Sequence, residues 1–238
     1  MTDAPHIPHM TAEQAERISA WHERAYAAAR AEAGVDGQTF SHLGLTLRVP
    51  PDVQPITGTS SMLGEAILAE TGVADRVLDM GCGSGVNGLL AATRTPHVVA
   101  VDISPHAVAA TLDNATRNGA AGRIDVRQSD VFGAIGAAEV FDLIIFDPPY
   151  RWFAARDWLE RASTDPDYHA LQAFFAGASD HLAPGGRMLI SFGSSGDIDY
   201  LHALMDSTGF DREVLAQDGM VRDAHRVDYF VYRVTRRA

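Results

Sequence analysis

The feature that most constrains the fold is a glycine-rich turn that follows a short apolar strand. The strand is predicted at Val77-Leu78, and three alternating glycines occupy positions 81, 83 and 85. A helix through Leu89 and Leu90 then leads to a second apolar strand at residues 98–101. This strand–helix–strand order predicts two parallel strands, because such strands require a crossover connection.

The same alternation continues along the chain. A further helix is predicted after Ser104 as N-cap, with Pro105 at its first position and Gly119 just past its end. Later strands are predicted near residues 124–126, 141–146 and 188–192, with helical segments between them. A further helix is predicted around residues 201–205. Residues 213–215 and 227–234, joined by a polar loop, predict a closing antiparallel pair. The chain is therefore predicted to be an α/β protein with a doubly wound, Rossmann-like and mostly parallel sheet.

The first 72 residues predict an appendage to this sheet. Thr11 and Gln14 have the spacing of a capping box, and the helix they begin is expected to stop at Gly34. A hairpin strand ending at Pro50 and a linker helix ending near Gly72 follow. We predict an N-terminal lid or substrate-recognition segment at residues 1–72 and the main domain at residues 73–238.

Composition restricts the classes of function. The chain has 238 residues and a net charge of −12, and all 19 of its basic residues are arginine. Extended binding to nucleic acid is therefore not expected, since it requires many cations at the phosphates. Cys82 is the single cysteine and no histidine pair has metal-ligand spacing, so neither a disulfide nor a metal site is predicted. Without a recognisable signal peptide or membrane segment, a cytoplasmic protein is expected.

The glycine-rich turn predicts a nucleotide-like cofactor. Residues 83–88 match the dinucleotide pattern G-x-G-x-x-G, and Asp102 lies near the position of a ribose-binding acid. Asp79 argues against NAD, because a carboxylate at this strand end would repel a pyrophosphate. It would instead attract the ammonium and sulfonium groups of S-adenosylmethionine, which is the cofactor we expect.

The second motif is Asp147-Pro148-Pro149-Tyr150, directly after an apolar strand. Proline carbonyls can only accept hydrogen bonds, and Asp147 adds another acceptor. A planar amine that donates to Asp147 and to the Pro148 carbonyl would turn its lone pair toward a methyl donor, while Tyr150 stacks on its plane. A rigid turn without a ligand is the competing interpretation.

Over about residues 77–192 the chain resembles class I S-adenosylmethionine-dependent methyltransferases of the "small domain" group, which have a seven-stranded sheet. It is similar to release-factor glutamine methyltransferases and ribosomal-RNA guanine-N2 methyltransferases, although Asp147 replaces the asparagine of the glutamine enzymes. The resemblance implies Asp147, Pro148 and Tyr150 as catalytic residues. It implies cofactor contacts from Asp79, Gly81, Cys82, Gly83, Gly85, Asp102, Ile103, Asp130, Val131 and Asp147.

The methyl acceptor is left open by the sequence. Pro149, Arg151, Trp152, Phe153 and Trp158 could line a substrate pocket or pack between helices. We expect methyl transfer to a planar nitrogen of a protein, a nucleotide or RNA, or a metabolite. The alternatives are an O- or C-methyltransferase for small molecules and a cofactor-binding interaction protein without catalysis.

Overall fold

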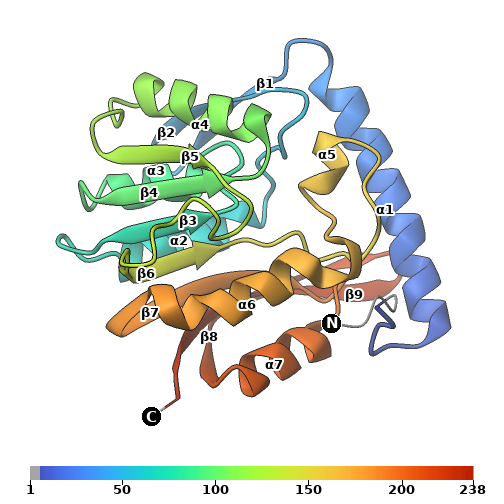
Figure 1. The fold of residues 1–238 in the computed structure, drawn as a ribbon. Helices are drawn as coiled ribbons and strands as arrows, with labels where there is room; N and C mark the ends of the chain where they lie inside the picture. The colour runs from blue at the N-terminus through green and yellow to red at the C-terminus, as the bar shows by residue number, and fades with distance from the viewer. Residues whose placement is uncertain (1–5, 238) are drawn as a thin grey trace.

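A seven-stranded sheet forms the centre of the computed structural model, which describes residues 6–237 (Figure 1). The strand order is β5-β4-β3-β6-β7-β9-β8, in which the first five strands are parallel and β9 is antiparallel to both of its neighbours. This confirms the predicted fold class. The strands are β3 (Val77–Met80), β4 (Val98–Asp102), β5 (Ile124–Gln128), β6 (Phe141–Phe146), β7 (Leu182–Gly193), β8 (Phe210–Arg222) and β9 (His225–Arg236).

Helices cover both faces of the sheet because its central strands are apolar on both sides. On β6, Leu143 and Ile144 are both fully buried and belong to hydrophobic clusters on opposite faces. One cluster includes side chains of the helices in the foreground of Figure 1, α6 (His169–His181) and α7 (Ile198–Ser207). The other includes residues of α2 (Ser60–Glu70) and α3 (Val86–Ala92).

The helix caps predicted from the sequence are present in the structure. Thr11 and Gln14 form the capping box of α1 (Ala12–Ala33), and Gly34 is its C-cap. The Ser104 side chain accepts a hydrogen bond from the backbone of Ala107 at the start of α4 (Pro105–Arg117). In both cases the side chain satisfies an N–H that has no partner within the helix, which stabilises the helix start.

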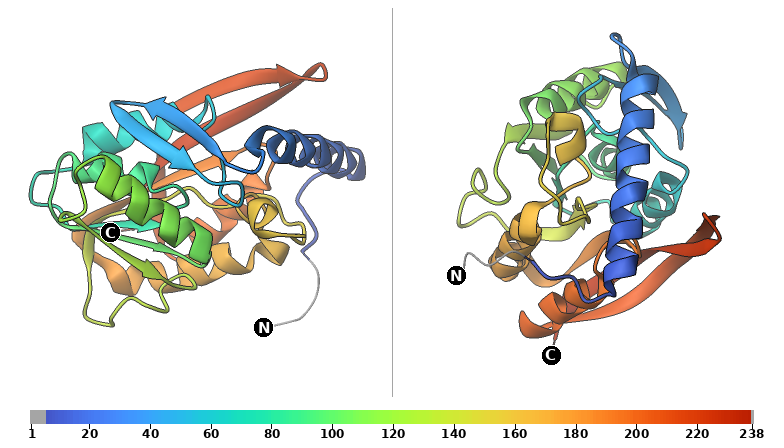
Figure 2. Two further views of the ribbon diagram at one scale, coloured as in Figure 1. Left: turned by 90° about the horizontal axis from the view of Figure 1, so that it is seen from above. Right: turned by 90° about the vertical axis from the view of Figure 1, so that its right-hand side faces the viewer.

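The N-terminal segments lie along one side of the sheet. Strands β1 (Gln38–His42) and β2 (Leu45–Val49) form the predicted antiparallel hairpin. Figure 2 shows α1 running along the side of the molecule, past the short helix α5 (Trp158–Arg161). The predicted boundary at residue 72 falls between α2 and β3. No helix in the described residues has the length and apolar character needed to cross a membrane.

Three local predictions were wrong. Residues 129–140, between β5 and β6, form turns instead of a helix. Strand β7 begins at Leu182, so the predicted proline-glycine turn lies within it and is accompanied by a register shift against β6. The predicted polar loop before β9 consists of strand residues, because β8 and β9 form one long hairpin that turns at Asp223 and Ala224. Much of β8 is exposed and polar, so its hydrophobic alternation is weak.

Sheet register places the two sequence motifs next to each other. Met80 at the end of β3 pairs with Phe146 at the end of β6, so the glycine-rich loop and Asp147 leave adjacent strands at the same edge. Strand β4 pairs with β3 on its other side and ends at Asp102. The chain connections diverge at β3, and such a switch point is where open α/β sheets bind ligands.

Candidate functional site

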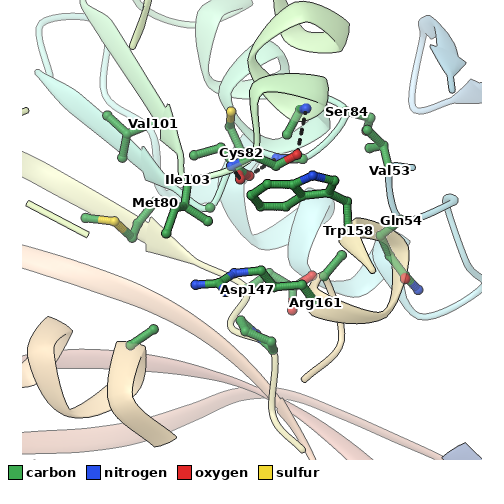
Figure 3. Close-up of a pocket in the computed structure, with 18 of the residues that line it drawn as sticks. Val53, Gln54, Met80, Cys82, Ser84, Val101, Ile103, Asp147, Trp158 and Arg161 are labelled. Atoms are coloured by element: carbon green, nitrogen blue, oxygen red, sulfur yellow. Dashed lines mark hydrogen bonds between the residues drawn. The ribbon is translucent and has the colours of Figure 1, made fainter. Parts of the chain in front are cut away.

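A pocket opens at the carboxyl ends of β3, β4 and β6 (Figure 3). Its empty space is about 1250 Å³ including the open mouth. Many of the sequence-predicted site residues line it. They are Gly81, Cys82, Gly83, Asp102, Ile103, Asp130, Val131, Asp147 and Pro149.

The glycine-rich loop depends on backbone conformations that favour glycine. Gly81, Gly83 and Gly85 all have positive φ angles. At Gly85 a Cβ atom would also lie 2.9 Å from the Cγ2 atom of Thr111, so this position needs glycine for space as well. The Thr111 hydroxyl donates to the sulfur of Cys82 at 3.3 Å. Burial raises the pKa of the Cys82 thiol well above its ordinary value, which favours a packing role over a nucleophilic one.

Asp102 connects the loop to the start of α4. Its Oδ2 atom accepts a hydrogen bond from the Gly83 N–H at 2.9 Å, and its Oδ1 atom accepts one from the Ser104 N–H at 2.8 Å. Desolvation raises the pKa of Asp102 despite these bonds, while the charge of Arg161 acts in the opposite direction. Each carboxylate oxygen can accept a second hydrogen bond, so the residue can still bind hydroxyl groups of a ligand.

Asp79 lies beneath the loop and is absent from the pocket lining. Its side chain is fully buried, and Oδ2 accepts a hydrogen bond from the Gly88 N–H at 2.7 Å. Within residues 6–237, Oδ1 has no hydrogen-bond partner. Burial, together with the charges of Asp102 and Asp147, raises the pKa of Asp79 to about 7, although the hydrogen bond from Gly88 acts against the shift. A nearby cation would stabilise the ionised form of such a buried acid.

Asp147 lines the pocket and is exposed, although many protein atoms surround its carboxylate. Desolvation raises its pKa to about 6, and a hydrogen bond with the Ser191 side chain acts against this shift. Together with Asp79 and Asp102, it makes the site rich in carboxylates that are poorly compensated by protein cations. Such a site favours a positively charged ligand and hydrogen-bond donors.

Of the other residues of the second motif, Pro149 lines the pocket, whereas Pro148 and Tyr150 do not. The ring centroids of Tyr150 and Phe192 lie 5.5 Å apart. The backbone carbonyl of Tyr150 accepts a hydrogen bond from the Tyr168 hydroxyl at 2.7 Å. Thus Tyr150 packs on β7 instead of forming a stacking surface in the pocket, and Pro148 is buried. Gly85, the N-cap of α3, is likewise absent from the lining.

The residues predicted to wall a substrate pocket separate into two groups. Arg151 is buried and reaches His22 of α1 at 3.4 Å, while the rings of Trp152 and Phe153 lie 5.0 Å apart in a hydrophobic cluster with α1. None of these three lines the pocket. Trp158 does, and Figure 3 shows it reaching into the pocket together with Arg161.

Sequence reasoning missed Arg161 and the loop at residues 52–56. Arg161 follows Trp158 by three residues, so a helix assignment at 158–161 would have placed both on one face. The loop at 52–56 carries no motif, and its position depends on how the β1–β2 hairpin packs. In the described part of the chain, no group of three or more histidine, cysteine or acidic residues is arranged to hold a metal ion.

Comparison with known proteins gives a consistent set of similarities. The family model "Methyltransferase small domain" matches residues 57–219. A release factor glutamine methyltransferase of Cereibacter sphaeroides is 36% identical, and the match covers 64% of this chain and 58% of the relative. A ribosomal RNA small subunit methyltransferase C of Chromohalobacter salexigens is 34% identical over 77% of this chain and 51% of the relative. The chain thus spans about half the length of these relatives.

Solved structures share the fold. A 16S rRNA methyltransferase of T. thermophilus, solved with AdoMet and guanosine, has a TM-score of 0.60 at 22% identity, covering 84% of this chain and 50% of that chain. A tRNA methyltransferase of M. jannaschii has a TM-score of 0.63 at 20% identity, covering 86% of this chain and 55% of that chain. These likenesses support the seven-stranded Rossmann-like architecture.

Proposed function

Because the chain belongs to the methyltransferase small domain family, we propose that it is an S-adenosylmethionine-dependent methyltransferase that acts on a nitrogen atom of a protein or RNA. One observation carries this proposal. Sheet register places Asp147 beside the glycine-rich loop, and both line one pocket with Asp102. A cofactor site and a set of hydrogen-bond acceptors are thereby brought within one cavity.

The residues present fit S-adenosylmethionine. The buried Oδ1 atom of Asp79 has no partner in the described structure, and the neighbouring carboxylates of Asp102 and Asp147 have raised pKa values. The positive charges of the cofactor would compensate them. When bound, the cofactor supplies an electrophilic methyl group on a sulfonium sulfur.

We assign roles to the chain's residues on this basis. Asp102 accepts hydrogen bonds from the ribose hydroxyls, and Asp130 and Val131 lie where an adenine would be held. Asp147, which lines the pocket, accepts an N–H group of a planar acceptor and so orients its lone pair, whereas Pro148 is buried and absent from the lining. The nitrogen gains the methyl group and loses one proton, and the electron pair of the broken bond stays on sulfur.

The acceptor's class follows from the relatives' names and is tested directly. Cell extract is separated into protein, RNA and small-molecule fractions and incubated with the protein and S-adenosylmethionine carrying a radiolabelled methyl group. We expect label in the protein or the RNA fraction. Label confined to the small-molecule fraction would favour a metabolite acceptor instead, and label in no fraction would argue against methyl transfer.

Asp147→Ala tests the role of the second motif. Turnover should fall by ~10² or more, as for loss of one oriented polar group at a reacting centre, while cofactor affinity stays within a few fold. Binding is measured by calorimetry with S-adenosylhomocysteine. If affinity collapses and turnover per bound enzyme is unchanged, Asp147 serves the cofactor and the nitrogen assignment fails.

A filter-binding titration separates RNA from protein acceptors. With a net charge of −12, the chain should bind free RNA weakly. Submicromolar binding that persists at physiological salt would instead favour an RNA acceptor.

A further inference from the structure

Two segments outside the central sheet complete the pocket. One is the loop at residues 52–56, and the other is residues 158–166, which comprise α5 and the turn after it. We call them the outer wall. The glycine-rich loop and Asp147 are held by strand pairing, whereas the outer wall contains no strand of the sheet. With only four residues, α5 is too short to be stable by itself.

A single side chain of α1 links both parts of the outer wall. The Nη1 atom of Arg30 donates to Oδ1 of Asp52 at 3.2 Å, and its Nη2 atom donates to Oδ2 of Asp157 at 2.6 Å. Asp52 lies in the first segment, and Asp157 is the N-cap of α5. The hydroxyl of Tyr26 also donates to Asp157. The planar guanidinium suits this bridge, since it can donate to two carboxylates at once.

The two faces of α5 have different partners. Glu160 is buried and contacts His22 of α1 at 2.8 Å, so it faces the same helix as Asp157 does. Trp158 and Arg161 instead reach into the pocket (Figure 3). The positive charge of Arg161 acts on Asp102, which places it at the edge where the ribose is proposed to bind. Movement of α1 relative to the sheet would therefore move two side chains of the pocket.

We propose that Arg30 is a positioning residue that joins the outer wall to α1 and thereby keeps the wall closed over the bound cofactor. This inference rests on the proposed function of the pocket. Arg30 does not line the pocket, so it acts through the wall residues. Loss of its two contacts should loosen the wall, raise the dissociation rate of the cofactor and leave the acceptor-orienting groups at Asp147 in place.

The test compares two arginines of the same helix. Arg30→Gln removes the bridge, whereas the control Arg24→Gln removes an ion pair with Asp223 at the tip of the β8–β9 hairpin, away from the pocket. Titration calorimetry gives the Kd for S-adenosylhomocysteine, and tryptophan fluorescence after rapid mixing gives its release rate. We expect Arg30→Gln to raise Kd and KM for S-adenosylmethionine by about 10-fold, as for loss of a charged hydrogen bond, with kcat changed less than about two-fold.

The outcomes are distinguishable. If wild type binds S-adenosylhomocysteine and Arg30→Gln binds it equally well, the inference is overturned while the proposed function stands. Equal weakening by Arg24→Gln would also overturn it, because the effect would then be a general loss of stability. If wild type does not bind, the proposed function fails first. Should Arg30→Gln not fold, Tyr26→Phe removes one hydrogen bond to Asp157 and must weaken binding in the same direction.

Discussion

Replacing Asp79 by asparagine should make the stability of the ligand-free protein less dependent on pH. Burial raises the pKa of Asp79 from 3.8 to about 7, so the folded state holds a proton that the unfolded chain releases. For an acid with a raised pKa, the stabilising contribution is fully present below pH 3.8 and is lost as the pH rises through 7. Asparagine cannot titrate, so the variant lacks this pH-dependent loss.

The size of the effect follows from the shift. A pKa raised from 3.8 to about 7 corresponds to about 4 kcal/mol of unfolding free energy at high pH. About 3 kcal/mol of this develops between pH 5 and pH 8, because the unfolded carboxyl is already largely ionised at pH 5. The full shift applies here since Asp79 has no exposed surface.

Urea denaturation at pH 5 and pH 8, without cofactor, measures the difference. The free energy of unfolding of Asp79→Asn minus that of wild type should be larger, in the stabilising direction, by about 3 kcal/mol at pH 8 than at pH 5. Asp113→Asn is the matched control, because Asp113 is exposed and pairs with Arg117 on the surface of α4. A relative stability of Asp79→Asn that is the same at both pH values would refute the reasoning.

Three further predictions concern other parts of the site and the fold. In Gly88→Ala the new Cβ would lie 2.9 Å from the Oδ2 atom of Asp79, so urea denaturation should show a loss of about 1–3 kcal/mol. A hundredfold excess of S-adenosylhomocysteine over its Kd should stabilise wild type by ~2.7 kcal/mol in a thermal-shift assay, and Asp102→Ala should lose most of this. Hydrogen bonds from Arg127 lower the pKa of Glu139 to about 2. The contribution of Glu139 to stability is thus present above its ordinary pKa and disappears as the pH falls toward 2. Glu139→Gln should lower the free energy of unfolding by less than ~1 kcal/mol at pH 7, because the Arg127–Glu139 pair is partly exposed.

The sequence by itself determined the core of the site because its signals are local. Glycines at 81, 83 and 85 require a backbone that few other residues adopt, and Asp102 and Asp147 directly follow apolar strands. Parallel strands of one sheet end at the same edge, so both motifs were expected at that edge, and the pairing of β3 with β6 makes them neighbours. Cap residues such as Ser104 act within one turn of helix and were equally readable.

Only the tertiary structure decided which side chains close the pocket. Tyr150 adjoins Asp147 in sequence, yet it packs against Phe192 because the chain turns toward β7. Arg30 and Asp157 lie 127 residues apart and meet only because α1 runs alongside α5. Neither hydrophobic periodicity nor turn residues specify such a contact. It depends on how helices far apart in the sequence pack against each other and bring their charges together. The outer wall of the pocket therefore depends on tertiary packing, whereas local sequence signals predict the edge of the sheet that the wall covers.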